Sequence, residues 1–229
     1  MSTIYKPQDV IHMIDVSCLK PETDEALVRQ TCKDAVQYGY AAVFAMSAWL
    51  PLTASLLRGS PVKVGASIGF PLGSHSSLVK VFEVRDAIAS GGEELDMQMN
   101  VGALKSGNYD LVKRDIQAVV EAGQGRLVKV ILETCLLTDD EKRIACEIAE
   151  SAGVDFVKTS SGFAASGATV ADICLMRASV SERVSVKAAG GINSFDQVWE
   201  LLNAGATRFG IGTAKALIIA QEALTRQKT

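Results

Sequence analysis

The stretch VDFVKTSSG, residues Val154–Gly162, is a short apolar run that carries one lysine and then breaks into small polar residues. Such a run predicts a buried parallel β-strand that ends in a functional loop. Because side chains alternate between the two faces of a strand, Lys158 shares a face with Phe156 and Ser160, and Thr159 is expected on the opposite face. A charged lysine in a buried strand costs several kcal/mol unless its charge is paired, lost or used. Lys158 is therefore either an ion-paired or snorkelling side chain, or a reactive amine.

A second stretch, VSVKAAGG (Val184–Gly191), repeats this design, with Lys187 near the end of the apolar run. If the two strands are neighbours in one parallel sheet, they lie about 4.8 Å apart and their ammonium groups approach the same point. A lysine that attacks a carbonyl must be neutral, so its pKa has to move from about 10.4 towards about 7, which requires about 4 to 5 kcal/mol. A second positive charge about 4 Å away supplies about 4 kcal/mol at an effective dielectric constant of about 20. The two lysines together predict amine chemistry.

The composition of the chain is that of one well-packed globular domain. It has 229 residues, of which 48% are hydrophobic and 21% are charged, and we expect a single domain over residues 1–229. The net charge of −3 provides no basic field, so nucleic acid is not an expected partner. No apolar run reaches membrane-spanning length and no secretory pattern opens the sequence, so we expect no membrane association and a cytoplasmic location.

Cysteine and histidine residues are not spaced as metal ligands or as a disulfide framework. The five cysteines lack CxxC spacing and the two histidines stand far apart: Cys18, Cys32, Cys135, Cys146, Cys174, His12 and His75. Most of the cysteines are expected to be buried small hydrophobic residues. We expect no metal and no other cofactor, although carboxylates alone could still hold Mg²⁺.

Apolar runs and helical patterns alternate along the whole chain. The expected strands are Val10–Leu19, Ala41–Met46, Val62–Phe70, Glu93–Met99, Leu127–Leu132, the two lysine runs and Arg208–Gly212. The expected helices are Glu25–Gln37, Ala48–Leu57, Leu78–Ser90, Leu111–Ala122, Thr138–Ala152, Thr169 or Asp172 to Val180, Asp196–Ala204 and Ala214–Leu224. Glycines that end helices recur before the next strand, at Gly39, Gly59, Gly91, Gly123, Gly153 and Gly205. Eight strands and eight helices favour an α/β fold of the (β/α)8 TIM-barrel type, and an open doubly wound sheet is the alternative.

In a barrel of this kind the chemistry lies at the carboxyl ends of the strands, where both lysines are expected. Strand alternation also places Asp96, Gln98 and Asn100 on one face, as a polar lining. The carboxylate of Asp96 needs cationic partners, and the two lysines are the obvious ones. For Gln98 and Asn100 a hydrogen-bond network without a chemical role is the alternative. We interpret Lys129 and Glu133 mainly as a structural ion pair, with electrostatic tuning of the site as their second role.

Glycine-rich loops after the last two strands are suited to phosphate, which backbone N–H groups and a helix N-terminus bind in many barrels. Glycine lets the backbone approach an anion closely, although glycine turns are also ordinary loop chemistry. The expected substrate- and phosphate-binding residues are Ser17, Thr159, Gly162, Gly190, Gly191, Gly210, Gly212 and Thr213.

Five motifs, spread in order over nearly the whole chain, resemble those of the deoxyribose-phosphate aldolase family. They are Ile68–Gly73, Asn100 with Gly102–Gly107, Glu133–Leu137, Phe156–Phe163 and Val186–Ile192. The resemblance implies that Lys158 is the Schiff-base lysine, that Lys187 perturbs it, and that Asp96 works with Lys187 in proton relay through water. It also implies a substrate, 2-deoxy-D-ribose 5-phosphate, that is cleaved to acetaldehyde and D-glyceraldehyde 3-phosphate. The expected partners are then small phosphorylated sugars and aldehydes. The sequence does not decide whether the chain forms a homodimer or a higher homo-oligomer.

Several positions depart from the usual pattern of that family, whereas the three charged residues are retained. The departures are Asp15-Val16-Ser17, Phe44–Ser47, Gln98 and Gly212-Thr213-Ala214. We expect these departures to affect how the natural sugar fits the site, and not the chemistry of the lysine amines. One alternative is a related Schiff-base aldolase or lyase with a different aldehyde donor or sugar-phosphate acceptor. A second is a catalytically silent sugar-phosphate sensor, which would ordinarily have lost one of the charged residues.

Overall fold

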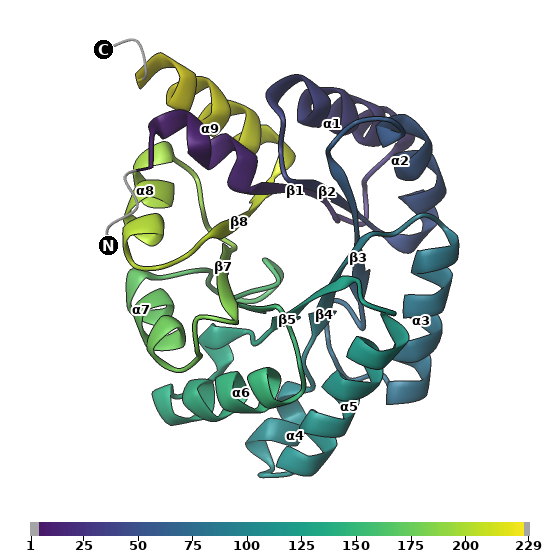
Figure 1. The fold of residues 1–229 in the computed structure, drawn as a ribbon, viewed down its shortest axis with the longest axis vertical. Helices are drawn as coiled ribbons and strands as arrows, with labels where there is room; N and C mark the ends of the chain where they lie inside the picture. The colour runs from purple at the N-terminus through teal and green to yellow at the C-terminus, as the bar shows by residue number, and fades with distance from the viewer. Residues whose placement is uncertain (1–4, 227–229) are drawn as a thin grey trace.

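Eight parallel strands close into a barrel in the computed structural model, which describes residues 5–226. Each strand pairs with its neighbours in sequence, and the last pairs with the first (Figure 1). The strands are β1 (Ile14–Cys18), β2 (Ala42–Ala45), β3 (Lys63–Ile68), β4 (Glu94–Gln98), β5 (Leu127–Ile131), β6 (Phe156–Lys158), β7 (Ser185–Ala189) and β8 (Arg208–Gly212). The expected barrel is confirmed, and the open-sheet alternative is wrong because β1 and β8 are paired.

Helices surround the barrel as an outer ring (Figure 1). They are α1 (Glu25–Tyr38), α2 (Leu50–Leu57), α3 (Ser77–Ala89), α4 (Val101–Lys105), α5 (Tyr109–Ala122), α6 (Asp139–Ser151), α7 (Val170–Ala178), α8 (Phe195–Asn203) and α9 (Thr213–Arg226). Three short 3-10 helices, η1 (Pro7–Met13), η2 (Ser47–Trp49) and η3 (Thr134–Leu136), join them. Within residues 5–226, no helix is both long and apolar enough to span a membrane.

Two elements differ from the sequence expectation. The first strand begins at Ile14 rather than Val10, because Pro7–Met13 forms η1, with Pro7 at its first turn. The short helix α4 was not expected, since its five residues include Gly102 and are too few to show a helical period. Its first turn is capped by Asn100, whose Oδ1 accepts a hydrogen bond from the backbone N–H of Ala103 at 3.0 Å.

Helix starts follow the capping residues in the sequence. Thr138 opens α6 with a capping box: its Oγ1 accepts from the backbone N–H of Glu141, and the Glu141 carboxylate accepts from the backbone N–H of Thr138 at 2.8 Å. Of the two candidate starts of α7, Thr169 is the cap. Most of the expected glycine stops have positive φ, but Gly123 does not, because Gln124 and Gly125 take that conformation instead.

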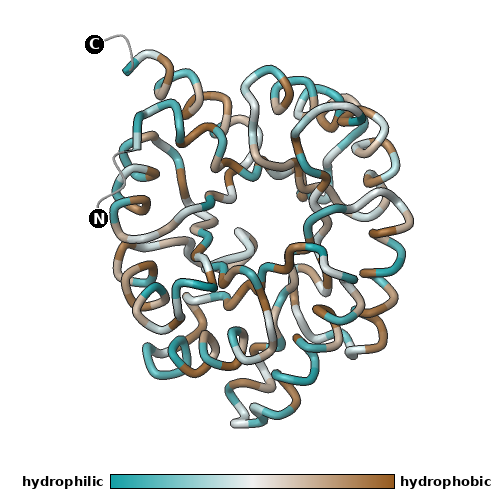
Figure 2. Tube along the Cα trace, in the orientation of Figure 1, coloured by the Kyte–Doolittle hydropathy of each residue, from teal (hydrophilic) through white to brown (hydrophobic). Residues whose placement is uncertain are grey.

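The hydrophobic core lies on the strand face opposite to the lysines. Its members on successive strands are valines and a leucine, all buried: Val16, Val43, Val64, Leu95, Val128, Val157 and Val186. Hydrophobic and hydrophilic segments alternate along the outer helices, as expected for helices with one buried face (Figure 2). Strand alternation then turns the intervening side chains into the barrel, and these carry the charges.

Strand register sets the heights of these inward side chains. Lys158, Lys187 and Arg208 are direct partners across β6, β7 and β8 and form one row. Asp96 and Lys129 are partners across β4 and β5. Partners in adjacent strands lie about 4.8 Å apart, and the side chains of these rows all point into the barrel. Long side chains in the rows can therefore contact one another inside the barrel.

Candidate active site

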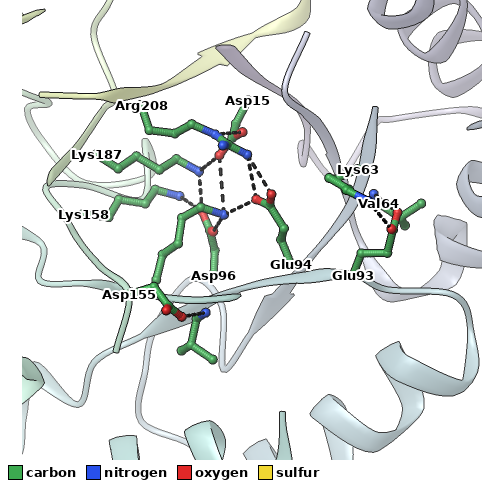
Figure 3. Close-up of polar contacts among 12 residues, drawn as sticks. Asp15, Lys63, Val64, Glu93, Glu94, Asp96, Asp155, Lys158, Lys187 and Arg208 are labelled. Carbon is green, nitrogen blue, oxygen red and sulfur yellow. Dashed lines mark hydrogen bonds and ion pairs between the residues drawn. The ribbon is translucent and has the colours of Figure 1, made fainter. Parts of the chain in front are cut away.

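Asp96 on β4 is the meeting point of the two lysines. Its Oδ2 accepts hydrogen bonds from Nζ of Lys158 and from Nζ of Lys187, both at 2.7 Å. The three side chains are buried and point toward one another inside the barrel (Figure 3). The expected convergence of the two ammonium groups on one point is confirmed, and the carboxylate is shared between them.

A third lysine, Lys129 on β5, completes the contacts of Asp96. Its Nζ lies 3.0 Å from Asp96 Oδ1, 2.6 Å from Glu94 Oε2 and 3.6 Å from Asp15 Oδ2. The expected Lys129–Glu133 ion pair is wrong, because Glu133 follows the end of β5 with φ 60° and ψ 60°, which breaks the strand alternation. The Glu133 carboxylate instead accepts from the backbone N–H of Ser161 at 3.1 Å.

Asp15 on β1 and Arg208 on β8 close the cluster across the seam of the barrel. Asp15 Oδ2 lies 2.5 Å from Nζ of Lys187, and Asp15 Oδ1 lies 2.6 Å from Nε of Arg208. Arg208 also holds Glu94, with Oε2 at 2.8 Å. Sequence reasoning gave no role to Asp15 and missed Glu94 and Arg208. Glu94 could have been found from its position two residues before Asp96 on the same strand, which places both side chains on the same face.

The charges of this cluster do not balance when every group is ionised. Three carboxylates face four cations: Asp15, Glu94 and Asp96 against Lys129, Lys158, Lys187 and Arg208. An excess positive charge in a buried site is costly. Loss of a single lysine proton would neutralise the cluster, so its composition favours one neutral amine.

Burial is the main cause that lowers the pKa of Lys187 to about 8. Asp15 and Asp96 oppose this effect, and the Lys158 and Lys129 ammonium groups add to it. The pKa of Asp96 is raised by burial, but the three lysines outweigh this effect and hold it well below its usual range. At neutral pH the site therefore combines an ionised carboxylate with an easily deprotonated lysine.

The ring of Phe44 on β2 covers part of the cluster. Nζ of Lys187 lies 4.3 Å and Nζ of Lys129 lies 4.6 Å from the ring centroid, within the range of a cation–π interaction. The ring occupies the place where a side chain at position 65 would be, since a Cβ on Gly65 would lie 2.5 Å from it. Gly65 thus lets Phe44 lie inside the barrel.

A cavity of about 580 Å³ opens onto the cluster. Asp15, Lys158 and Lys187 of the cluster line it, together with Phe44. Most of the expected substrate- and phosphate-binding residues line it as well: Ser17, Gly162, Gly190, Gly191, Gly210, Gly212 and Thr213. The structure thus brings residues from β1, β6, β7, β8 and the loops that follow them around one space.

The glycine loops of the cavity have the geometry of an anion site. Gly190 and Gly191 have φ values of 81° and 72°, a conformation that favours glycine. A Cβ on Gly191 would meet nothing closer than 3.8 Å, so the backbone there is open to a ligand. The long helix α9 begins at Thr213, and helix N-termini favour anions.

Three expected polar residues are engaged elsewhere. Thr159 does not line the cavity, because its hydroxyl bridges β6 and β7 by donating to the carbonyl of Ala189 and accepting from its N–H, both at 3.0 Å. The expected phosphate contact from Thr159 does not fit this placement, which follows from its position on the face opposite Lys158. Gln98 is buried beside Glu133 at 3.4 Å, and Asn100 caps α4, so the structural alternative fits both.

Among residues 5–226, no group of three or more histidine, cysteine, aspartate or glutamate side chains is arranged to hold a metal ion. The cysteines of this part of the chain are all free: Cys18, Cys32 and Cys146 are buried, Cys135 is half-buried and Cys174 is exposed. Metal independence itself remains a prediction.

Comparison with known proteins agrees with this geometry. The family model described as DeoC/LacD family aldolase matches residues 11–214. The chain belongs to this aldolase family. This aldolase, a carbon–carbon lyase, is 52% identical over 210 residues to a deoxyribose-phosphate aldolase of Streptococcus sanguinis, which covers 92% of this chain and 96% of the relative. It is 49% identical over 212 residues to that of Lysinibacillus sphaericus, with 92% and 95% covered.

Solved structures resemble this aldolase over almost their full length. One, an aldolase named QR15, has a TM-score of 0.91 and 36% sequence identity and covers 96% of this chain and 98% of its own. Another, from Aeropyrum pernix, is described as a tetrameric deoxyribose phosphate aldolase and has a TM-score of 0.88 with 28% identity, covering 96% and 93%. The family resemblance inferred from the motifs is therefore confirmed.

Proposed function

We propose that this aldolase reversibly cleaves 2-deoxy-D-ribose 5-phosphate to acetaldehyde and D-glyceraldehyde 3-phosphate through a Schiff base on Lys158. The observation that carries the proposal is the pair of amines, Lys158 and Lys187, that share one oxygen of Asp96 at 2.7 Å. The names of the bacterial relatives support the choice of substrate.

Lys158 is proposed as the nucleophile. Its side chain lines the cavity and retains 5% exposure, whereas Lys187 lies deeper, at 1%. A neutral Lys187 can accept the proton of Lys158 by way of the Asp96 carboxylate that both contact, which leaves Lys158 as a free amine.

The free amine of Lys158 adds to the aldehyde carbon of the open-chain sugar, and loss of water gives an iminium ion. Removal of the proton from the C3 hydroxyl then breaks the C2–C3 bond, and its electron pair moves to the iminium to form an enamine. Glyceraldehyde 3-phosphate leaves as the first product. Protonation of the enamine at C2 and hydrolysis release acetaldehyde and regenerate Lys158. We assign the proton transfers to Asp96 and Lys187, through water.

The phosphate group is placed at the glycine loops after β7 and β8. The open backbone at Gly191, the positive φ of Gly190 and Gly191, and the N-terminus of α9 at Thr213 support this placement. A related aldolase with a different aldehyde donor or acceptor is the second candidate, because the ring of Phe44 lines the cavity beside Lys187, 4.3 Å from its Nζ. Both candidates use the same amine chemistry, and turnover of a panel of phosphorylated and unphosphorylated sugars separates them.

Reductive trapping tests the proposal directly. Acetaldehyde and sodium borohydride should replace one amine hydrogen of the protein with an ethyl group, a net gain of C2H4, and inactivate the enzyme. Peptide mapping should place the label on Lys158. Lys80 is a buried control lysine in the same protein, since it is held by Asp115 at 2.5 Å outside the cavity. Absence of a label with every aldehyde tested would refute the Schiff-base mechanism, and a label on Lys187 would reverse the two roles.

We also infer that a second copy of this chain covers an apolar face of α3. This face consists of Leu78, Val79 and Phe82, which are 82%, 46% and 69% exposed. Exposed apolar patches on soluble proteins commonly mark interfaces, and the tetrameric description of the Aeropyrum relative supports self-association. The cytoplasmic location and the absence of nucleic-acid and membrane partners remain predictions.

A further inference from the structure

Glu133, directly after β5, combines burial with an unfavourable backbone conformation. Its φ of 60° and ψ of 60° lie in the left-handed region, which costs free energy for any residue with a Cβ. Among residues 5–226, one other residue besides the glycines, Gln124, has a positive φ, and it is exposed in the turn after α5. Glu133 is only 4% exposed. Glycine would take this conformation without cost, so the contacts of the buried carboxylate have to offset the strain.

Backbone pairing makes Glu133 an extra residue between β5 and β6. The N–H of Leu132 donates to the carbonyl of Lys158 at 2.9 Å, and the N–H of Thr134 donates to the carbonyl of Thr159 at 3.0 Å. The chain after β5 thus advances by two residues while the chain after β6 advances by one, as in a β-bulge. Bulges redirect side chains, and the side chain redirected here is that of Glu133.

The carboxylate of Glu133 joins β4 to the loop after β6 (residues 159–169). Its Oε2 lies 3.4 Å from Nε2 of Gln98 on β4, and its Oε1 accepts a hydrogen bond from the backbone N–H of Ser161 at 3.1 Å. The hydroxyl of Ser161 in turn accepts from the backbone N–H of Phe163 at 3.1 Å. Glu133 thereby fixes the segment of residues 161–163, which follows closely after Lys158.

Segment 161–163 is the part of this loop that lines the cavity. The ring of Phe163 contacts Phe70 edge to face, with the two centroids 5.2 Å apart, and Nζ of Lys20 lies 4.9 Å from its centroid. Phe163 is 41% exposed, whereas Lys158 is 5% exposed. The segment therefore leads outward from the end of β6 to the loops after β3 and β1.

Segment 161–163 also adjoins the glycine loop after β7. A Cβ on Gly190 would lie 3.6 Å from Cα of Gly162. In the proposed Schiff base, C1 of the sugar is bonded to Nζ of Lys158, so C1 and C2 lie next to the charged cluster. The carbons C3 to C5 extend from there towards the phosphate at the glycine loops. Segment 161–163 is the wall that accompanies them, since it connects the same two places.

We propose that Glu133 is a positioning residue that holds segment 161–163 against the acceptor half of the substrate, the three carbons that leave as the phosphorylated aldehyde. This inference rests on the proposed function, since it concerns the same substrate. Glu133 touches no reacting atom and acts through the backbone N–H of Ser161. Its removal should slow the cleavage of the full sugar phosphate and spare the chemistry of acetaldehyde alone.

Replacement of the carboxylate by a thioether of similar length tests this difference. Glu133→Met should lower kcat/KM for 2-deoxy-D-ribose 5-phosphate by about tenfold, the effect expected for one hydrogen bond to a charged group. Exchange of the C2 hydrogens of acetaldehyde for deuterium in D2O, followed by NMR, reports the iminium and the enamine on Lys158 without any acceptor. This exchange should keep the wild-type rate.

Two further variants separate the carboxylate from the strained backbone. Glu133→Gln should retain most of the cleavage activity, because its Oε1 can accept from Ser161 and its Nε2 can donate to Gln98 Oε1, which has no partner among residues 5–226. Glu133→Gly relieves the strain but removes the acceptor, so we expect it to lose cleavage as Glu133→Met does. Circular dichroism shows that each variant is folded at the assay temperature.

Glu93→Met is the matched control. Glu93 also accepts from a backbone N–H, that of Val64 at 3.1 Å, but neither residue lines the cavity. Both rates should therefore match the wild type in this control. Equal losses of cleavage and of deuterium exchange in Glu133→Met, or wild-type cleavage by Glu133→Gly, would overturn the inference. The borohydride label on Lys158 of the wild type decides the proposed function separately, because it does not depend on any variant of Glu133.

Discussion

Replacement of Lys187 by methionine, which has a side chain of similar length, removes a buried charge from the centre of the site. The lost ammonium lies 2.5 Å from Asp15 Oδ2 and 2.7 Å from Asp96 Oδ2. With Lys187 at a pKa of about 8, roughly one molecule in ten carries it in the neutral form at pH 7. The wild type should therefore gain about tenfold in kcat/KM between pH 7 and pH 9 and then reach a plateau.

In Lys187→Met the buried amine whose pKa is lowered to about 8 is lost, so no neighbouring lysine is left to accept the proton of Lys158. The lowering of the Lys187 pKa from the ordinary lysine value of about 10.4 to about 8 corresponds to about 3 kcal/mol and to a loss of roughly 100- to 300-fold at pH 7. Because hydroxide can take over this proton transfer, much of the loss should be recovered by pH 10. Slow trapping on Lys158 should remain detectable throughout.

The assay is retro-aldol turnover of 2-deoxy-D-ribose 5-phosphate from pH 6 to pH 10, with peptide mapping after borohydride. Circular dichroism at each pH confirms that the variant is folded, and Lys33→Met controls for the loss of one lysine charge. A variant that keeps more than a tenth of wild-type activity at pH 7 would refute the reasoning. The same holds for a loss of equal size at pH 7 and pH 10.

Four further outcomes are expected. Lys158→Ala should abolish both turnover and trapping, since no other amine of the site would replace it; labelling of the variant by acetaldehyde would contradict this. Gly191→Asp should raise KM for the phosphorylated substrate about tenfold or more and spare an unphosphorylated one, because it puts a negative charge in the phosphate site, and equal damage to both would point to misfolding. Exhaustive EDTA treatment should leave full activity, and restoration of a lost activity by Zn²⁺ or Mg²⁺ would count against the mechanism. Phe82→Asp should shift the mass measured by light scattering towards that of a monomer, and an unchanged mass would place the interface elsewhere.

Strand alternation was sufficient to find the centre of the site. It placed Lys158, Lys187 and Asp96 on inward faces, and neighbouring parallel strands brought them together. The same rule failed for Glu133. This residue follows β5 in the left-handed conformation, which turns its side chain away from the expected face, and no local sequence pattern predicts that conformation.

The parts that sequence could not supply depend on closure of the barrel. Arg208 contacts Asp15 and Glu94, which belong to strands at other places on the ring, and their distances depend on strand register and side-chain length. Local signals define elements, whereas contacts across the ring need the whole structure.

The pairing of Asp15 with Lys187 and Arg208 has a consequence for how the enzyme is made. Asp15 is 172 residues before Lys187 and 193 before Arg208, so its partners are synthesised last. Contacts of such long sequence separation form late in folding, because closing a long loop of chain carries a large entropic cost. During synthesis on the ribosome, the carboxylate of Asp15 has to remain hydrated until β8 emerges and pairs with β1. We therefore expect a nascent chain that lacks β8 to have no activity, and activity to begin only when the barrel is closed.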